Sequence, residues 1–92
     1  MTTREKVALI TKPSACMSCH SIINPLGFSL EHFDAIGRYR EKEADRTIDA
    51  SSELPVLSGD PARFNGARDL AEFIASDHQA HAAFVDQLFH QA

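Results

Sequence analysis

The residues best suited to chemistry lie in one short stretch, Cys16-Met17-Ser18-Cys19-His20, which holds both cysteines of the 92-residue chain. Two thiols three positions apart, with an imidazole directly after the second, suit covalent haem attachment, zinc binding, a dithiol couple or a local disulfide. On a helix, these three side chains stand at i, i+3 and i+4 and point in one direction. That spacing favours haem, because two thioether bonds and an iron ligand must reach one macrocycle.

The other uses of the motif stay open with less support. A structural zinc site needs a fourth ligand, and the adjacent Cys19 and His20 are awkwardly placed around one tetrahedral ion. A thioredoxin-like dithiol normally follows a strand in a βαβ unit, and no strand is predicted before Cys16. A disulfide or a plain structural pair of cysteines also fits these residues.

Composition limits the class of protein. A chain of this length makes one small domain, and such domains often rely on a cofactor, a metal or a crosslink. The net charge of −4 and the absence of a basic block argue against a nucleic-acid surface. No apolar run is long enough to span a membrane. Residues 1–6 lead into no export signal, which fits either a cytosolic protein or an export signal that lies upstream of this sequence.

Helical spacing in the first 41 residues predicts a mainly α fold. The expected helices run from Thr2, capped through Glu5, to before Pro13; over 15–23, ended by Asn24-Pro25; and from Ser29, with Leu30, Phe33 and Ile36 buried and Gly37 after the last turn. The segment 25–28 is expected to be a loop. These three helices would make up a haem-attachment segment over 1–41.

The remainder divides into a connector and a helical pair. Residues 42–66 lose helical periodicity, so we expect an irregular connector with room for one short β-hairpin. Helical spacing returns at 67–75, where Leu70, Phe73 and Ile74 are expected to point inward. A last helix begins at Ser76, with an apolar face at Phe84, Val85, Leu88 and Phe89. That face is still strong at Ala92, which predicts that 67–92 is truncated. All three segments are expected to form one compact domain.

The sequence around the cysteines resembles a known module. The stretch CMSCHSIINPLGFSLEHFDAIGRYR at 16–40 contains Cys-x-x-Cys-His, then Pro-Leu-Gly-Phe at 25–28, then Phe-Asp-Ala-x-Gly-Arg at 33–38. It is similar to the cytochrome c-like module of large planctomycete multidomain surface proteins. The segments IDASSELP at 48–55 and FNGARDLAEFIA at 64–75 resemble the adjoining C-terminal domain of unknown function in the same proteins.

The resemblance implies a haem c on Cys16 and Cys19, with His20 as the proximal iron ligand, in a small helical cytochrome c-like domain. It implies an electron-transfer module of a larger protein at the periplasm or cell surface, with the other domains of that protein and a redox partner as its contacts. No catalytic activity is expected of the fragment, although peroxidase-like turnover at an open iron site is a minor option. The alternative is a non-redox interaction domain with a disulfide or metal at the two cysteines. Expression without maturation machinery would leave the haem absent.

The rest of a haem site is less defined. Arg38 is a candidate for the haem propionates, because guanidinium groups suit carboxylates, and pairing with a nearby Asp or Glu is its equal alternative. No methionine is placed to be the distal ligand, since Met1 is terminal and Met17 lies between the two cysteines. The remaining candidates for the distal position are His32, His78, His81 and His90, with no preference among them.

Overall fold

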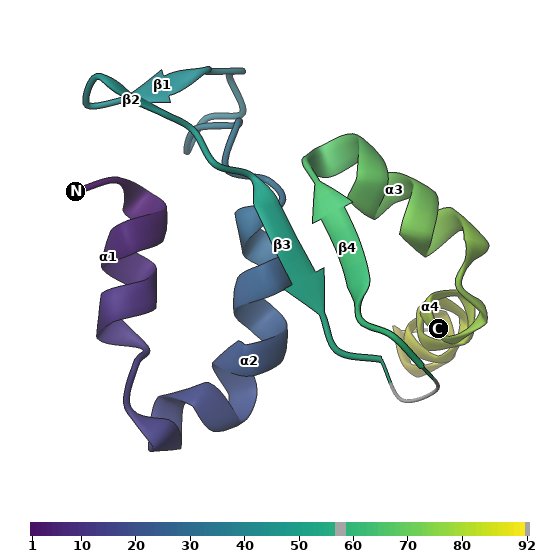
Figure 1. Ribbon diagram of the computed structural model, residues 1–92. Helices are drawn as coiled ribbons and strands as arrows, with labels where there is room; N and C mark the ends of the chain where they lie inside the picture. The colour runs from purple at the N-terminus through teal and green to yellow at the C-terminus, as the bar shows by residue number, and fades with distance from the viewer. Residues whose placement is uncertain (57–58, 92) are drawn as a thin grey trace.

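The computed structural model describes residues 1–56 and 59–91, in which four helices and two small antiparallel sheets follow one another along the chain (Figure 1). The elements are α1 (Thr3–Ile10), α2 (Ser14–Phe28), β1 (Lys42–Glu43), β2 (Arg46–Thr47), β3 (Ser51–Leu54), β4 (Ala62–Asn65), α3 (Ala67–Ser76) and α4 (His78–Gln91). The expected mainly α class with a short hairpin is confirmed. No helix of the described residues has the length and apolar character to cross a membrane.

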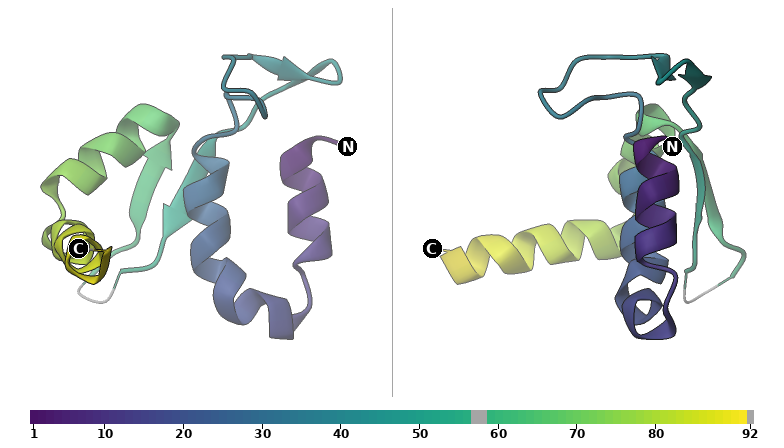
Figure 2. Two further views of the ribbon diagram at one scale, coloured as in Figure 1. Left: turned by 180° about the vertical axis from the view of Figure 1, so that it is seen from behind. Right: turned by 90° about the vertical axis from the view of Figure 1, so that its left-hand side faces the viewer.

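The β3–β4 hairpin lies between two helices and organises the fold. In Figures 1 and 2, α1 and α2 run antiparallel, β3 lies beside α2, and α3 lies beside β4. The last helix, α4, projects away from the other elements, as the right-hand view of Figure 2 shows. The radius of gyration of 14.7 Å exceeds the roughly 12 Å of a compact domain this long. The projecting helix accounts for this excess.

The hydrophobic core lies where the hairpin meets α3. Leu54, Phe64 and Leu70 are buried in it, and Phe73 packs edge-to-face on Phe64 with ring centroids 5.3 Å apart. Leu26 brings α2 into contact with the same cluster. The expected inward positions of Leu70 and Phe73 are thus confirmed, whereas that of Ile74 is wrong, because its side chain is 46% exposed. The expected buried stripe at Leu30, Phe33 and Ile36 is wrong, since these side chains are 47%, 42% and 75% exposed.

Helix α2 continues through the proline that was expected to end it. Pro25 lacks the N–H that an uninterrupted helix would use, which normally breaks a helix. Here the next residue, Leu26, packs into the core, and the Ser52 hydroxyl donates a 2.7 Å hydrogen bond to the Pro25 carbonyl. These tertiary contacts offset the local cost and extend α2 to Phe28, so the segment 25–28 is the last helical turn and not a loop.

The helix expected from Ser29 to residue 36 is also absent, because Ser29 closes α2. Its N–H donates to the Pro25 carbonyl and its hydroxyl donates to the Leu26 carbonyl, so Ser29 is a C-terminal cap. The chain then turns at Gly37, whose φ of +85° is a conformation that glycine adopts at little cost. The expectation for Gly37 was right about its backbone and wrong about the helix before it.

Residues 42–66, expected to be irregular around one hairpin, contain all four strands. Ser52 pairs with Phe64, and Leu54 with Ala62. The shorter β1–β2 hairpin turns at Ala44 and Asp45, which both have positive φ. Two-residue hairpin turns need this conformation and usually take it from glycine or asparagine, so the sequence carried little signal for the second hairpin.

The last helix begins two residues later than expected. The Ser76 hydroxyl donates back to the carbonyls of Glu72 and Phe73 and belongs to α3. Asp77 takes the capping role, because its carboxylate accepts a 2.9 Å hydrogen bond from the Ala80 N–H. The expected apolar residues of α4, namely Phe84, Val85, Leu88 and Phe89, are 55–82% exposed.

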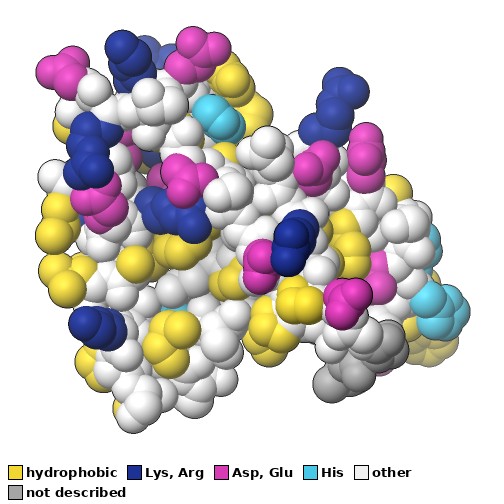
Figure 3. Space-filling model, viewed as in Figure 1, with side chains coloured by type: hydrophobic (Ala, Val, Ile, Leu, Met, Phe, Trp, Pro, Cys, Tyr) yellow, Lys and Arg dark blue, Asp and Glu magenta, His cyan; other side chains and the backbone are white. Residues whose placement is uncertain are grey.

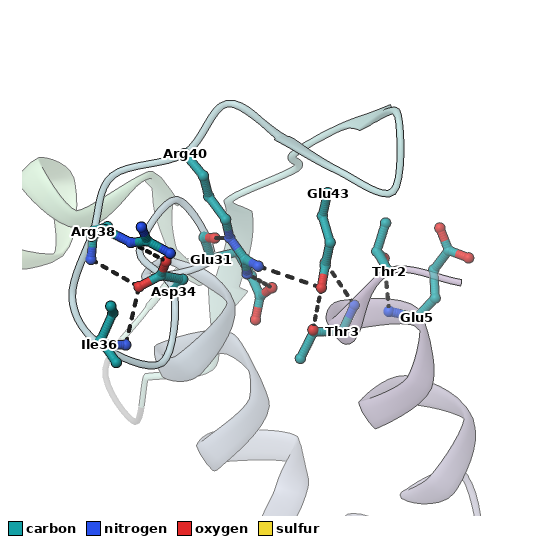
Figure 4. Close-up of polar contacts among 9 residues, drawn as sticks. All are labelled: Thr2, Thr3, Glu5, Glu31, Asp34, Ile36, Arg38, Arg40 and Glu43. Carbon is teal, nitrogen blue, oxygen red and sulfur yellow. Dashed lines mark hydrogen bonds and ion pairs between the residues drawn. The ribbon is translucent and has the colours of Figure 1, made fainter.

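The amino end of α1 is attached to the β1–β2 hairpin by polar contacts (Figure 4). Thr2 caps the helix by accepting a hydrogen bond from the Glu5 N–H, as the sequence predicted. The hydroxyl and N–H of Thr3 both donate to the Glu43 carboxylate, and Arg46 forms a 2.8 Å ion pair with Glu5. No apolar residue of α1 is buried. The position of α1 therefore depends on hydrogen bonds and ion pairs.

The ion-pair network continues from Glu43 into the loop after α2. Arg40 lies 3.4 Å from both Glu43 and Glu31 and also donates to the Glu31 carbonyl (Figure 4). Burial raises the pKa of Glu31, and the positive charge of Arg40 acts in the opposite direction. The network joins α1, the loop and the hairpin into one unit.

We expect the core, and not the apolar face of α4, to carry the stability. Phe64→Ala should lower the free energy of unfolding by about 3–5 kcal/mol, because it removes a buried ring and leaves a cavity. Phe84→Ala is the matched control: its ring is 66% exposed, so a change below about 0.5 kcal/mol is expected. Urea unfolding of both variants checks this, and a larger loss in Phe84→Ala would show that the core lies elsewhere.

The Thr3–Glu43 contact should make stability dependent on acid. Hydrogen bonds from Thr3 lower the pKa of Glu43, so this group stabilises the fold above its unfolded pKa, and that contribution is lost as pH falls through the lowered value. Glu43→Gln should lower the free energy of unfolding at neutral pH by up to about 1 kcal/mol and flatten its decline below about pH 4. Thermal unfolding across pH measures both effects.

Glu41→Gln is the control for that experiment. Glu41 is exposed, and the contact that it makes in the network region is through its backbone carbonyl, which accepts from the Ile48 N–H. We expect Glu41→Gln to keep the acid profile of the parent chain. Identical profiles for the two variants would contradict the role given to Glu43.

Candidate functional site

The cysteine motif occupies the first two turns of α2. The predicted helix at Cys16, Cys19 and His20 is confirmed, although it begins after Pro13, whose carbonyl accepts from the N–H groups of Cys16 and Met17. Cys19 is exposed and Cys16 is half-buried, and neither forms a disulfide. Both thiols are therefore available for covalent chemistry.

One face of α2 carries the two thiols, the imidazole and one isoleucine. Cys16, Cys19, His20 and Ile23 stand at i, i+3, i+4 and i+7, so they share this face. The Ile23 side chain is 53% exposed. Gly27, one turn further on, has open space where a side chain would begin. We call these five residues the thiol face; Cys19, Ile23 and Gly27 are exposed in it, and Cys16 and His20 are half-buried.

His20 is held from behind by a chain of hydrogen bonds. Its Nδ1 lies 2.9 Å from the Oδ1 of Asn24, and the Asn24 amide donates a 2.9 Å hydrogen bond to the hydroxyl of Thr11. The Thr11 hydroxyl donates in turn to the Val7 carbonyl at 2.7 Å. Asn24 and Thr11 are both buried. These contacts join the imidazole on α2 to the carboxyl end of α1.

Sequence reasoning missed Asn24 and Thr11 as site residues. Asn24 was interpreted only as part of a helix end at Asn24-Pro25, and no role was assigned to Thr11. The available signal was the spacing: Asn24 stands at i+4 from His20, where a side-chain amide reaches an imidazole on the same helix. Using that signal required α2 to continue through Pro25.

A hollow between α1 and α2 opens beside the imidazole. It is lined by Ala8 and Lys12 of α1 and the following turn, and by Met17, His20, Asn24 and Phe28 of α2, among others. The Phe28 ring also carries the Arg4 guanidinium 4.4 Å above its centroid. The space next to His20 is therefore mainly apolar, with one lysine at its edge.

Arg38 is not brought to the cysteine motif. It lies in the loop beyond the carboxyl end of α2, where its side chain pairs with Asp34 at 3.1 Å and its backbone N–H donates to the same carboxylate (Figure 4). The hydrogen bond from the Arg38 backbone, followed by one from Ile36, lowers the pKa of Asp34. In this structure Arg38 stabilises the turn, which was the alternative to its expected contact with a propionate.

The four candidate distal histidines lie in two other regions. His32 stacks on Tyr39 at 5.3 Å, with its Nδ1 2.9 Å from the Arg40 carbonyl. His78, His81 and His90 are exposed along α4, and His90 lies 3.7 Å from Asp86. His78 lines a hollow that also includes Ile22 of α2. The distal ligand remains a prediction without a preferred residue.

The structure bears on two of the other uses of the motif. Helix α1 precedes α2, so the thiols do not follow a strand as in a thioredoxin-like βαβ unit. Across residues 1–56 and 59–91, no three His, Cys, Asp or Glu side chains are grouped as a metal site would require. The thiol face offers two thiols and one imidazole as donors.

Charged side chains are concentrated near the amino end of α1, and the segment that contains α2 has none (Figure 3). Figure 3 shows Lys and Arg mixed with Asp and Glu over the upper part of the molecule, where the network of Figure 4 lies. Residues 13–30 contain no Asp, Glu, Lys or Arg. The thiol face therefore lies in an uncharged segment, which suits contact with an apolar macrocycle.

Comparison with known proteins gives one family match. The family model described as PSCyt3, a protein of unknown function (DUF1588), matches residues 1–43, a little less than half of the chain. This family is planctomycete and cytochrome-like by description, and its function is unknown. Neither the curated proteins nor the solved structures contain a match. The matched segment includes the whole cysteine motif, and the resemblance of residues 48–75 to the adjoining domain stays a prediction.

Proposed function

We propose that this chain carries one haem c, bound through Cys16 and Cys19 with His20 as the proximal ligand, and serves as an electron-transfer module of a larger envelope protein. The observation that carries the proposal is the thiol face: two free thiols, an imidazole and an exposed Ile23 share one side of α2. A bound haem supplies one-electron redox chemistry. The family match to residues 1–43 supports the cytochrome-like character of this part.

The chain's own residues would bind and orient the cofactor. Cys16 and Cys19 would each form a thioether with one vinyl group, which fixes the macrocycle along α2. His20 follows directly and offers a ring nitrogen on the same side. The exposed Ile23 and the open position at Gly27 would leave room for an apolar group beside the helix and would exclude water from part of its surface. The residues therefore suit a haem in two respects: they supply two thiols and an imidazole, and they leave open space beside Ile23 and Gly27.

A second candidate function is that of an interaction domain without haem. The observation that favours it is the exposed apolar face of α4, where Phe84 and Phe89 are 66% and 82% exposed. Large exposed apolar faces commonly mark contacts with other proteins or domains. The two functions are compatible in one module, and they differ in whether the cysteines carry a haem.

We expect covalent haem after expression with cytochrome c maturation machinery in an oxidising compartment. Mass spectrometry should show the mass of one haem added to the chain, and the absorption spectrum should change reversibly on reduction. Cys16→Ala combined with Cys19→Ala should abolish the added mass completely, because both thioether bonds are lost. Each single cysteine variant can form at most one thioether bond, so we expect less covalent haem in it than in the parent chain.

Ser18→Ala is the control for this experiment. Ser18 lies between the two cysteines, and its hydroxyl donates to the Ala15 carbonyl within the helix, so its removal should leave haem attachment intact. If the parent chain shows an unchanged polypeptide mass after expression with the maturation machinery, the haem proposal is refuted. The interaction domain is then the better-supported hypothesis.

A further inference from the structure

We infer that Asn24 and Thr11 are positioning residues that hold neutral His20 with its proton on Nδ1 and the lone pair of Nε2 free. The inference rests on the proposed function, in which Nε2 binds iron, but its physical basis is the polar chain behind the imidazole. In a neutral histidine one ring nitrogen donates and the other accepts, and the hydrogen bond at one of them decides which. The question is therefore the direction of each bond in this chain.

The Thr11 hydroxyl sets that direction because it has a single proton. It lies 2.7 Å from the Val7 carbonyl, which can only accept, so the proton is used there. Thr11 must then accept from its other partner, Asn24, at 2.9 Å. An acceptor at Thr11 requires the amide nitrogen of Asn24 to face it, which leaves the amide oxygen facing His20.

The direction then passes to the imidazole. The Asn24 oxygen, 2.9 Å from Nδ1, accepts and cannot donate, so Nδ1 must carry the proton. The reversed amide would direct the Thr11 proton to Asn24 and leave the Val7 carbonyl without this bond. Because Asn24 and Thr11 are buried, water cannot easily replace a lost partner. The orientation that satisfies every group is the one that frees Nε2.

This arrangement matters for a metal-ligating histidine in two ways. A free imidazole prefers its proton on Nε2, the nitrogen needed for iron, so binding would first require a change of tautomer. A hydrogen bond from Nδ1 to a fixed acceptor removes that requirement, orients the ring and increases the electron density on Nε2. Asn24 and Thr11 thus prepare His20 before any cofactor is bound.

The test measures the tautomer of His20 directly in the full chain without haem. Long-range proton–nitrogen NMR at about pH 8, where histidines are generally neutral, distinguishes a protonated from an unprotonated ring nitrogen. We expect Nδ1–H in the parent chain. Asn24→Leu should shift the population to mainly Nε2–H, whereas Asn24→Asp, which keeps an acceptor at this point, should retain Nδ1–H.

A pair of variants at Thr11 separates positioning from packing. Thr11→Val keeps the shape of the side chain but removes its hydroxyl. The Asn24 amide can then present either its oxygen or its nitrogen to His20, so we expect a mixture of His20 tautomers. Thr11→Ser restores the hydroxyl and should restore Nδ1–H. This pair decides the matter even if Asn24→Leu fails to fold, which amide spectra of the same samples would show.

The matched control is Asn65→Leu. Asn65 is exposed in β4, and its backbone N–H donates a hydrogen bond to the Asp69 carboxylate. This substitution should leave the His20 tautomer unchanged. An Nε2–H tautomer in the parent chain, or a retained Nδ1–H in both Asn24→Leu and Thr11→Val, would overturn the inference.

The haem-loaded chain gives a second measurement. A stronger acceptor at Nδ1 makes the ligand more electron-donating, so the reduction potential should fall in Asn24→Asp and rise in Asn24→Leu relative to the parent chain. The mass test above decides haem attachment independently of the tautomer. If haem attaches but His20 is a mixture of tautomers, only the positioning role is refuted. If His20 carries its proton on Nδ1 but no haem attaches, only the proposed function is refuted.

Discussion

The structure depends on how α1 is held, because this helix buries no apolar side chain of its own. Its amino end is fixed by Thr3 and Glu5, which contact Glu43 and Arg46 of the β1–β2 hairpin. Its carboxyl end is fixed by Thr11, which accepts from Asn24. Arg4 adds further contacts, because it donates to the carbonyls of Asp49 and Ser51 and lies over the Phe28 ring of α2. The polar chain behind His20 exists only while α1 stays in place, so contacts far from the thiols support the site.

The small core explains what remains available for function. Burial is concentrated where the β3–β4 hairpin meets α3, with Leu26 as the contribution of α2. Leu26 lies in the last turns of α2, whereas Cys16 and Cys19 lie in its first two turns, which contribute no side chain to this cluster. A helix that contacts the core near its carboxyl end can present thiols and an imidazole near its amino end without disturbing that core.

Sequence patterns predicted the elements whose signals are local. The Thr2 cap, the helical cysteine motif and the inward positions of Leu70 and Phe73 follow from spacing within a few residues. The failures have one cause in common: a local signal was overruled by contacts distant in sequence. Pro25 did not end α2, because Leu26 and Ser52 stabilise the turn around it. Ser29 then became the end of that helix, and the expected third helix could not form.

The same division holds for the candidate site. Two thiols and an imidazole at i, i+3 and i+4 determine by themselves that Cys16, Cys19 and His20 share a helical face, because helix geometry is local. The partner of the imidazole was decided only by the tertiary structure. Asn24 reaches His20 because α2 passes through Pro25, and Thr11 directs Asn24 because α1 folds back against α2. A single hydroxyl proton, satisfied across two helices, sets the orientation of the ring, and no pattern within one segment contains that information.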